Sequence, residues 1–373
     1  MPRPHAALYL ALLIANAAAA AVSPPPFYSD KQDLMHYLDA SGNRHAVRTA
    51  RDWDIRRSHI LANMQRVMGP MPAIDDRVPL AVEILKEGRG EGYTWRRITY
   101  AAERRDRAYA YLYIPDKLGG RRVPAIVSLH GTTYRRYVPL SEAPADPKPN
   151  TGDTQYAQEL ATRGYVVIAP DYLFLGPDYK TDPYTLGYAS GTMKGIVNHI
   201  RAVDVLATMA EVDASRIGTI GLSLGGHNAL FLGVFEPRIR AVVSSAGFNT
   251  FSKYYGGNLK GWTSNRYMPR IATEYASQPD RMPFDFTEVL AALAPRPVFV
   301  NAPIGDSNFE VSGVRDCVTA ALPVYDRLFH SRDKLVAEYP EGGHGFAPAA
   351  RQVAYKLLDR WLGHTATDQA AAR

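Results

Sequence analysis

The spacing of apolar residues changes along the chain, and each change predicts a different kind of structure. From residue 27 to about 75 the sequence is mostly polar, and its apolar residues recur at helical spacing until Gly69-Pro70. These residues are Trp53, Ile55, Ile60, Met64 and Met68. Such spacing predicts helix that stops at the glycine and proline. Alternation of apolar and polar residues then predicts strands at residues 80–85, 93–100 and 108–115.

From residue 123 onward, nearly continuous apolar runs alternate with helical patterns. The expected strands lie at residues 123–131, 165–170, 216–221, 239–247, 296–303 and 334–340. The expected helices lie at residues 154–164, 195–210, 224–235, 313–329 and 350–363. Continuous apolar strands are typical of parallel sheets that are buried on both faces. The alternation therefore predicts an α/β fold with a mainly parallel, doubly wound sheet and helices on both faces.

The first 22 residues have the features of a signal peptide. Arg3 precedes an apolar run at residues 6–22, whose alanines offer several A-x-A cleavage registers. The alternative is an uncleaved membrane anchor, but the run is short for a span and contains Asn16. We expect a periplasmic or secreted protein without a membrane segment after cleavage. The expected units are a signal peptide (1–22), a helical N-terminal extension (23–78), a catalytic domain (79–364) and a disordered tail (365–373).

Composition excludes several classes of function. The net charge is +6, but the Lys and Arg residues form no long basic run, which argues against nucleic-acid binding. The single cysteine, Cys317, allows no internal disulfide and is expected to be a small buried residue. The ten histidines form no HExxH motif, so neither a metal nor another cofactor is expected.

Candidate chemistry begins at Gly221-Leu222-Ser223-Leu224-Gly225, a Gly-x-Ser-x-Gly motif. A buried strand is predicted directly before it and a small-residue helix directly after it. In this context the flanking glycines permit a tight turn that holds the Ser223 hydroxyl at the carboxyl edge of the sheet. Ser223 is therefore a candidate nucleophile.

A serine nucleophile needs a base, and the base needs an orienting acid. Asp306 follows the strand predicted at 296–303, and His344 follows the next strand, among three glycines. Both would lie at the same edge of the sheet as Ser223, in the chain order serine, acid, histidine. Glu310 is the competing candidate for the acid.

An oxyanion hole would complete this set. The backbone N–H of Leu224 is the expected first donor, and the loop after the strand at 123–131 is the expected source of the second. Thr132 and Thr133 are both candidates there. His130 is expected to shape this loop, and His227 is expected to pack or form a hydrogen bond.

Two long aromatic inserts follow strands at the catalytic edge, at residues 172–190 and 247–284. Tyr172 and Trp262 are candidate substrate contacts there, because aromatic rings suit sugar faces and phenolic acids; packing within a lid is the alternative. Arg266 is a candidate partner for a carboxylate. Arg135 and Arg136 are candidates for the same role. The alternative is that these arginines are solvated or form salt bridges.

With these motifs the chain resembles the α/β-hydrolase superfamily, and more narrowly its exported dienelactone-hydrolase-like and acetyl-xylan-esterase-like serine esterases. The resemblance covers residues 95–364 and is carried by the segments LHG, GLSLGGH, RPVFVNAPIGDSNFE and PEGGHGF. Dienelactone hydrolases proper use a cysteine nucleophile, so Ser223 argues against that activity. The catalytic domain of prolyl oligopeptidases is similar too, but the N-terminal region here is too short for their propeller domain.

Together these patterns predict a serine hydrolase that cleaves carboxylic esters by a Ser223-His344-Asp306 acyl-enzyme mechanism. Its expected partner is a small-molecule or oligosaccharide ester, of the acetyl, feruloyl or glucuronoyl kind. A serine peptidase acting on short peptides is one alternative. A hydrolase-fold binding protein without turnover is another.

Overall fold

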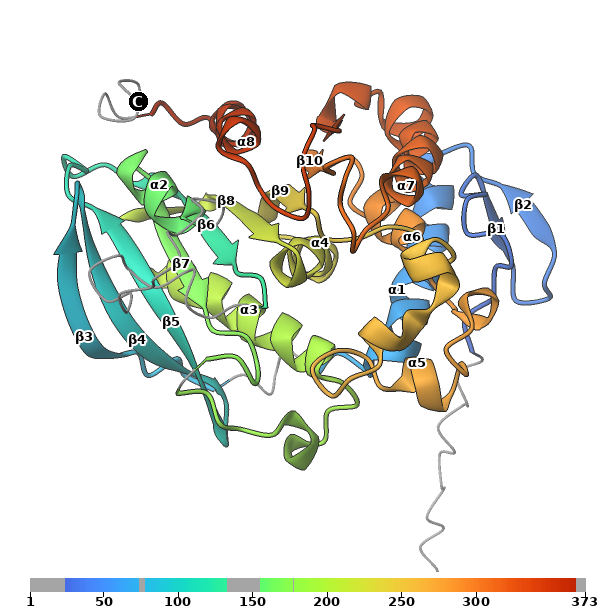
Figure 1. Cartoon of the computed structure of the whole chain (residues 1–373), viewed down its shortest axis with the longest axis horizontal. Coiled ribbons are helices and arrows are strands. Elements are labelled where there is room, and N and C mark those ends of the chain that lie inside the picture. The colour runs from blue at the N-terminus through green and yellow to red at the C-terminus, as the bar shows by residue number, and fades with distance from the viewer. Residues whose placement is uncertain (1–23, 74–77, 133–154, 177, 367–373) are drawn as a thin grey trace, which may run out of the picture.

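A large mixed sheet forms the centre of the molecule in the computed structural model (Figure 1). The structure describes residues 24–73, 78–132, 155–176 and 178–366. Within these residues the sheet has the strand order β11-β10-β9-β8-β6-β7-β5-β4-β3. The strands are β3 (Glu83–Gly90), β4 (Tyr93–Glu103), β5 (Asp106–Pro115), β6 (Val123–Leu129), β7 (Val166–Pro170), β8 (Val212–Leu222), β9 (Ile239–Ser245), β10 (Val298–Asn301) and β11 (Leu335–Glu338).

The direction of the strands divides the sheet into two parts. Strands β7, β6, β8, β9, β10 and β11 are parallel neighbours. Strands β3, β4 and β5 are antiparallel, and β5 joins the parallel part through an antiparallel pairing with β7. The predicted fold class, a mainly parallel sheet with helices, is confirmed. The parallel part matters most for function, because all its strands end at the same edge.

Helices cover both faces of the sheet (Figure 1). They are α1 (Ala50–Met68), α2 (Tyr156–Thr162), α3 (Gly191–Thr208), α4 (Leu224–Phe235), α5 (Arg270–Thr273), α6 (Phe286–Ala291), α7 (Val311–Pro323) and α8 (Pro348–Leu362). Alternate strand residues point to opposite faces: Val127 of β6 packs in the core with α3 and α4, whereas Ile126 packs in the core with α2 and α8. Across the described ranges, no helix is both long enough and apolar enough to traverse a bilayer.

The N-terminal region is not helical throughout, which corrects the expectation for residues 27–75. Helix α1 is present, but β1 (His36–Leu38) and β2 (Arg44–Ala46) precede it as an antiparallel hairpin. The Asp39 carboxylate accepts the N–H groups of Ser41 and Asn43, and Gly42 has a φ of 83°. Such local side-chain hydrogen bonds and a left-handed glycine stabilise a turn instead of a helix. The signal peptide predicted for residues 1–22 lies outside the described residues, as do residues 367–373 of the predicted tail.

Helix α1 is joined to the catalytic part of the chain by a buried ion pair. The Arg56 guanidinium donates to Glu288 Oε1 at 2.6 Å, and both side chains are fully buried. The Tyr28 ring lies over this guanidinium, 3.4 Å from its carbon. Glu288 lies in α6, directly after the second aromatic insert. Removing one partner of such a pair leaves the other charge buried and uncompensated, so α1 is an integral part of this fold.

Candidate active site

Ser223 occupies a sharp turn between β8 and α4. Its φ of 58° and ψ of −118° lie in a region that residues other than glycine rarely adopt. This backbone conformation costs about 1–3 kcal/mol of strain. The Ser223 N–H donates to the Ser245 carbonyl at the end of the neighbouring strand β9, at 2.9 Å. The turn thus holds the serine between the end of a parallel strand and the start of a helix.

The two glycines of the motif allow this turn to close. A Cβ at Gly221 would lie 2.1 Å from the Gly225 carbonyl oxygen. A Cβ at Gly225 would lie 1.9 Å from the carbonyl oxygen of Leu129, the last residue of β6. Both distances are far below any van der Waals contact with backbone. The glycines are therefore required by the close approach of β6, β8 and α4.

The side chains of Ser223, His344 and Asp306 form one hydrogen-bonded chain. Ser223 Oγ lies 2.9 Å from His344 Nε2, and His344 Nδ1 lies 3.0 Å from each oxygen of Asp306. Since an ionised carboxylate can only accept, Nδ1 carries the proton, and Nε2 is left to accept the serine proton. The Asp306 side chain is 1 % exposed and that of His344 is 25 % exposed. The carboxylate is therefore shielded from solvent, whereas the imidazole is partly open to it.

The structure distinguishes Asp306 from its competitor Glu310. Asp306 Oδ1 also accepts the N–H groups of Asn308, at 2.7 Å, and Phe309, at 3.1 Å, which fix the carboxylate in its loop. Glu310 is exposed and precedes α7, and its carboxylate contacts the Ser312 hydroxyl. Asp306, and not Glu310, is therefore the carboxylate in contact with His344.

Of the predicted oxyanion donors, Leu224 and Thr132 are described by the structure, and both lie close to the serine in the chain or in space. Leu224 is the first residue of α4, and among the described residues its N–H has no hydrogen-bond acceptor. The loop after β6 approaches from the other side, since a Cβ at Gly131 would lie 3.7 Å from that of Ser223. Thr132 follows Gly131 and is exposed. Thr133 lies outside the described residues.

The two other histidines of this region have structural contacts. His130 Nε2 accepts the Tyr172 N–H at 3.0 Å, and its Nδ1 lies 2.6 Å from the Gly131 carbonyl oxygen. His227 Nδ1 donates to the Gly247 carbonyl at 3.2 Å. Burial lowers the pKa of His130 to about 4 and that of His227 to about 3. Both rings are therefore neutral at physiological pH and shape the loops around the site.

The three predicted substrate contacts are largely packed into the lid. Tyr172 is buried, and its hydroxyl donates to the Arg266 carbonyl at 2.9 Å, so it joins the two inserts. Trp262 is 3 % exposed, with its ring edge against His227 at a centroid distance of 4.8 Å. Arg266 is half-buried. Arg135 and Arg136 lie outside the described residues.

Sequence reasoning missed the residues that hold the His344 loop. Asn301, the last residue of β10, donates from Nδ2 to the Ser245 hydroxyl at 2.8 Å. That hydroxyl donates to the Gly345 carbonyl at 3.1 Å, directly after His344. The Phe309 ring lies against the imidazole at a centroid distance of 5.9 Å. The signal was present: Ser245 and Asn301 are polar residues at the ends of apolar strands, where an α/β sheet places its functional groups.

Two further observations concern the metal-ligating and thiol side chains of the described residues. There, His, Cys, Asp and Glu form no group of three or more that could hold a metal ion. Cys317 is buried in α7, and burial raises the pKa of its thiol well above the usual value. A buried thiol with a raised pKa is not a nucleophile at neutral pH.

Known proteins resemble this chain over most of its length. The family model described as "Glucuronyl esterase, fungi" matches residues 196–328. The chain is 25 % identical to "Putative hydrolase YtaP" of Bacillus subtilis over 310 residues, which is 80 % of this chain and 97 % of that protein. It is 24 % identical to "4-O-methyl-glucuronoyl methylesterase 1" of Wolfiporia cocos over 345 residues, 87 % of this chain and 79 % of that protein.

Solved structures agree in fold. A glucuronoyl esterase from Solibacter usitatus superposes with a TM-score of 0.67 at 21 % identity, covering 90 % of this chain and 98 % of its own. A glucuronoyl esterase from Teredinibacter turnerae gives a TM-score of 0.68 at 18 % identity, with 87 % of each chain covered. The chain has the α/β-hydrolase fold. Its sequence is similar to that of carboxylic ester hydrolases, which is the class of enzyme that the sequence predicted.

Proposed function

We propose that this hydrolase cleaves glucuronoyl esters, in which a sugar acid is esterified through its carboxyl group, with Ser223, His344 and Asp306 as the catalytic residues. The observation that carries the mechanism is the continuous hydrogen-bonded chain from Ser223 Oγ through the imidazole to the Asp306 carboxylate. This is the arrangement by which a serine hydroxyl becomes a nucleophile.

In the first half of the reaction Ser223 Oγ attacks the ester carbonyl carbon, and His344 Nε2 takes the hydroxyl proton. The carbonyl oxygen becomes an oxyanion, which the N–H of Leu224 and a second N–H of the Thr132 loop would stabilise. Each such donor contributes about 10²- to 10³-fold to the rate. The positive end of the α4 dipole points at the same place. The tetrahedral intermediate collapses, and the alcohol leaves with the proton from His344.

In the second half a water molecule replaces the alcohol. His344 Nε2 takes a proton from this water, which attacks the acyl carbon and forms a second oxyanion in the same hole. The bond to Ser223 Oγ breaks, and His344 returns the proton to the serine. Asp306 stays ionised throughout and holds the imidazole in the tautomer that each step requires.

The choice of a glucuronoyl ester rests on two supports. The family model and the Wolfiporia cocos relative are both named for glucuronoyl esters. The lid and the adjacent helix α4 also have buried polar atoms without a hydrogen-bond partner in the described residues: Trp262 Nε1, Arg266 Nε and His227 Nε2. Two are donors and the third, on a neutral imidazole whose Nδ1 donates to Gly247, is an acceptor. All three atoms are closed off from solvent, so sugar hydroxyls would satisfy them only after the lid rearranges around the substrate.

The test is a substrate panel for the purified chain, with kcat/KM measured for each compound. We expect methyl glucuronate to exceed 4-nitrophenyl acetate, ethyl ferulate and an alanyl 4-nitroanilide by about tenfold or more, the discrimination that a few pocket contacts provide. Methyl galacturonate, which differs only at C4, is the matched sugar control and should also be poorer.

The outcomes separate the alternatives. A preference for the acetyl or feruloyl ester would overturn the substrate class and leave the serine mechanism intact. A preference for the anilide would indicate a peptidase. Failure of a fluorophosphonate probe to label wild-type Ser223 would overturn the mechanism itself and favour a binding protein.

A further inference from the structure

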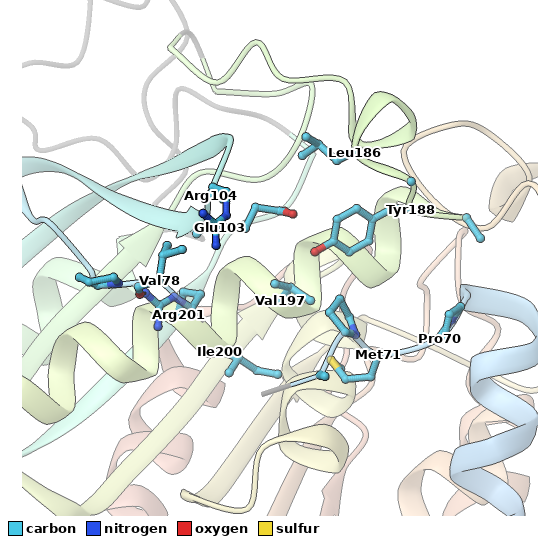
Figure 2. A pocket seen from close by; sticks show the side chains of 16 residues that line it. Pro70, Met71, Val78, Glu103, Arg104, Leu186, Tyr188, Val197, Ile200 and Arg201 are labelled. Atoms are coloured by element: carbon cyan, nitrogen blue, oxygen red, sulfur yellow. The ribbon is translucent and has the colours of Figure 1, made fainter. Parts of the chain in front are cut away.

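A cavity of about 630 Å³ lies apart from the candidate active site, against the outer surface of α3 (Figure 2). Its lining contains none of Ser223, Asp306 and His344. The walls come from the stretch after α1, the end of β4 and the turn after it, the segment before α3, and α3 itself. This volume lies in the range of pockets that bind small molecules.

Most of the residues that line the cavity are apolar. Val197 and Ile200 of α3 lie one turn apart on the same side of the helix and form one side of the cavity. Met71 and Tyr188 face them from two other segments (Figure 2), and three prolines complete the apolar wall: Pro70, Pro72 and Pro79. Proline rings, a thioether and a phenol ring are favourable surfaces for an aromatic ligand. The prolines also lose little conformational freedom when a ligand binds.

The polar end of the cavity carries charges of both signs. The buried Lys194 ammonium lies between the carboxylates of Glu103 and Asp106, at 2.5 and 2.7 Å. Arg104, an exposed residue in the turn between β4 and β5, adds another positive charge to the lining. An ionic ligand would lose part of its hydration here, and the Glu103 carboxylate and the Arg201 guanidinium are already engaged by groups of the protein.

The other polar groups of this wall are also committed. The Arg201 guanidinium donates to the Asp204 carboxylate and to the carbonyls of Val78 and Ala101. Burial, followed by the charge of Glu103, raises the pKa of the Tyr188 phenol, which therefore stays neutral. Glu103 is the group best placed to accept a hydrogen bond from a ligand, because its side chain is 28 % exposed, although its carboxylate also contacts Lys194 through Oε1 and the Tyr188 phenol.

We propose that this cavity is a second binding site, and that it takes a neutral aromatic alcohol whose ring packs against the prolines, Met71 and Tyr188 and whose hydroxyl donates to Glu103. The site is separate from the catalytic serine. Its occupancy does not depend on ester hydrolysis or on the identity of the ester substrate.

Three probes of one size test the chemistry: 4-methylbenzyl alcohol, 4-methylbenzoate and 4-methylbenzylamine. Isothermal titration of the full chain measures their binding. We expect the alcohol to bind with a dissociation constant of about 1 mM or below, a typical value for so small a ligand. Both ions should bind at least about tenfold more weakly, because each brings a charge that the cavity leaves unpaired.

Val197→Phe tests the location, since the larger ring fills the cavity from α3. Val353→Phe is the matched control, because Val353 is a half-buried valine on α8 at the opposite face of the sheet. We expect Val197→Phe to weaken binding of the alcohol at least about tenfold and Val353→Phe to leave it unchanged, with the rate of ester hydrolysis preserved in both. Leu186→Trp fills the cavity from the opposite wall and replaces Val197→Phe if that variant fails to fold.

Three results would overturn the proposal. The first is an absence of alcohol binding to the wild-type chain at concentrations up to about 10 mM, well above the expected dissociation constant. The second is binding that persists in a folded Val197→Phe or Leu186→Trp variant, which would place the ligand elsewhere. The third is binding of the benzoate or the benzylamine as tight as that of the alcohol.

Discussion

Replacing Asp306 by asparagine tests the most specific part of the proposed mechanism. Asp306 Oδ1 accepts two backbone N–H groups, so the amide oxygen of the asparagine is expected to occupy that position. The amide nitrogen then takes the place of Oδ2, 3.0 Å from His344 Nδ1. Two donors would face each other unless the imidazole moves its proton from Nδ1 to Nε2. In that tautomer Nε2 cannot accept the proton of Ser223.

The size of the effect follows from this competition. The amide oxygen keeps one acceptor near Nδ1, because Oδ1 is also 3.0 Å away, so the productive tautomer is penalised without being abolished. We expect kcat to fall by about 10²- to 10⁴-fold, or roughly 3–5 kcal/mol in the barrier, with little change in KM. The assay is steady-state hydrolysis of the best ester of the panel, with circular dichroism as a check on folding.

Glu310→Gln is the matched control, because it removes the same charge four residues away. Glu310 contacts Ser312 and is exposed, so this variant should stay within about twofold of wild type, as for most surface substitutions. A larger loss in Glu310→Gln than in Asp306→Asn would refute the assignment of Asp306. Loss of less than about tenfold in Asp306→Asn would refute the tautomer argument.

Three further predictions concern the same fold. Ser223→Ala should lower kcat by about 10⁴-fold or more at an unchanged melting temperature, and near-normal turnover would contradict the serine mechanism. Gly225→Ala should abolish or strongly destabilise folding, measured by melting temperature, because its Cβ would lie 1.9 Å from the Leu129 oxygen; a folded, active variant would contradict the steric argument. Burial, and then His130, lower the pKa of His199 to about 3, so unfolding takes up a proton, and stability should fall by about 1.4 kcal/mol per pH unit as the pH drops from 6.5. Urea unfolding at pH 7 and pH 4 should show a smaller loss in His199→Phe, and equal losses would refute the linkage.

The parts of the fold that follow a single dominant periodicity were predictable. The segments that form β6, β8 and β10 are apolar runs bounded by turn residues, so they were recognisable as strands. The segments between them have helical spacing, so the helices were predictable as well. The geometry at Ser223 was predictable too, because glycines on both sides of a serine between a strand and a helix leave few conformations. The same holds for the position of His344, since a histidine among glycines after a parallel strand must lie at the functional edge.

Local competition and tertiary packing explain what the sequence did not reveal. The hairpin before α1 depends on the Asp39 side chain, whose hydrogen bonds outweigh a weak helical pattern. Trp262 was a candidate substrate contact by residue type, yet its ring packs against rings of its own insert and against His227 and Phe309 from other segments. No periodicity encodes that packing. The contact of the Ser245 hydroxyl with the His344 loop likewise joins two segments that only the sheet brings together.

The ion pair between Arg56 and Glu288 has a consequence for the order in which the molecule assembles. Its two partners are 232 residues apart in sequence, so α1 is synthesised long before α6 can meet it. Closing a loop of this length costs conformational entropy before the contact can stabilise the fold. Such contacts therefore tend to form late in folding. Helix α1 is therefore expected to dock only after most of the chain has been made, and an early-terminated chain would present Arg56 and the apolar side of α1 to solvent. Docking of the N-terminal helix α1 thus depends on a residue in the last quarter of the chain.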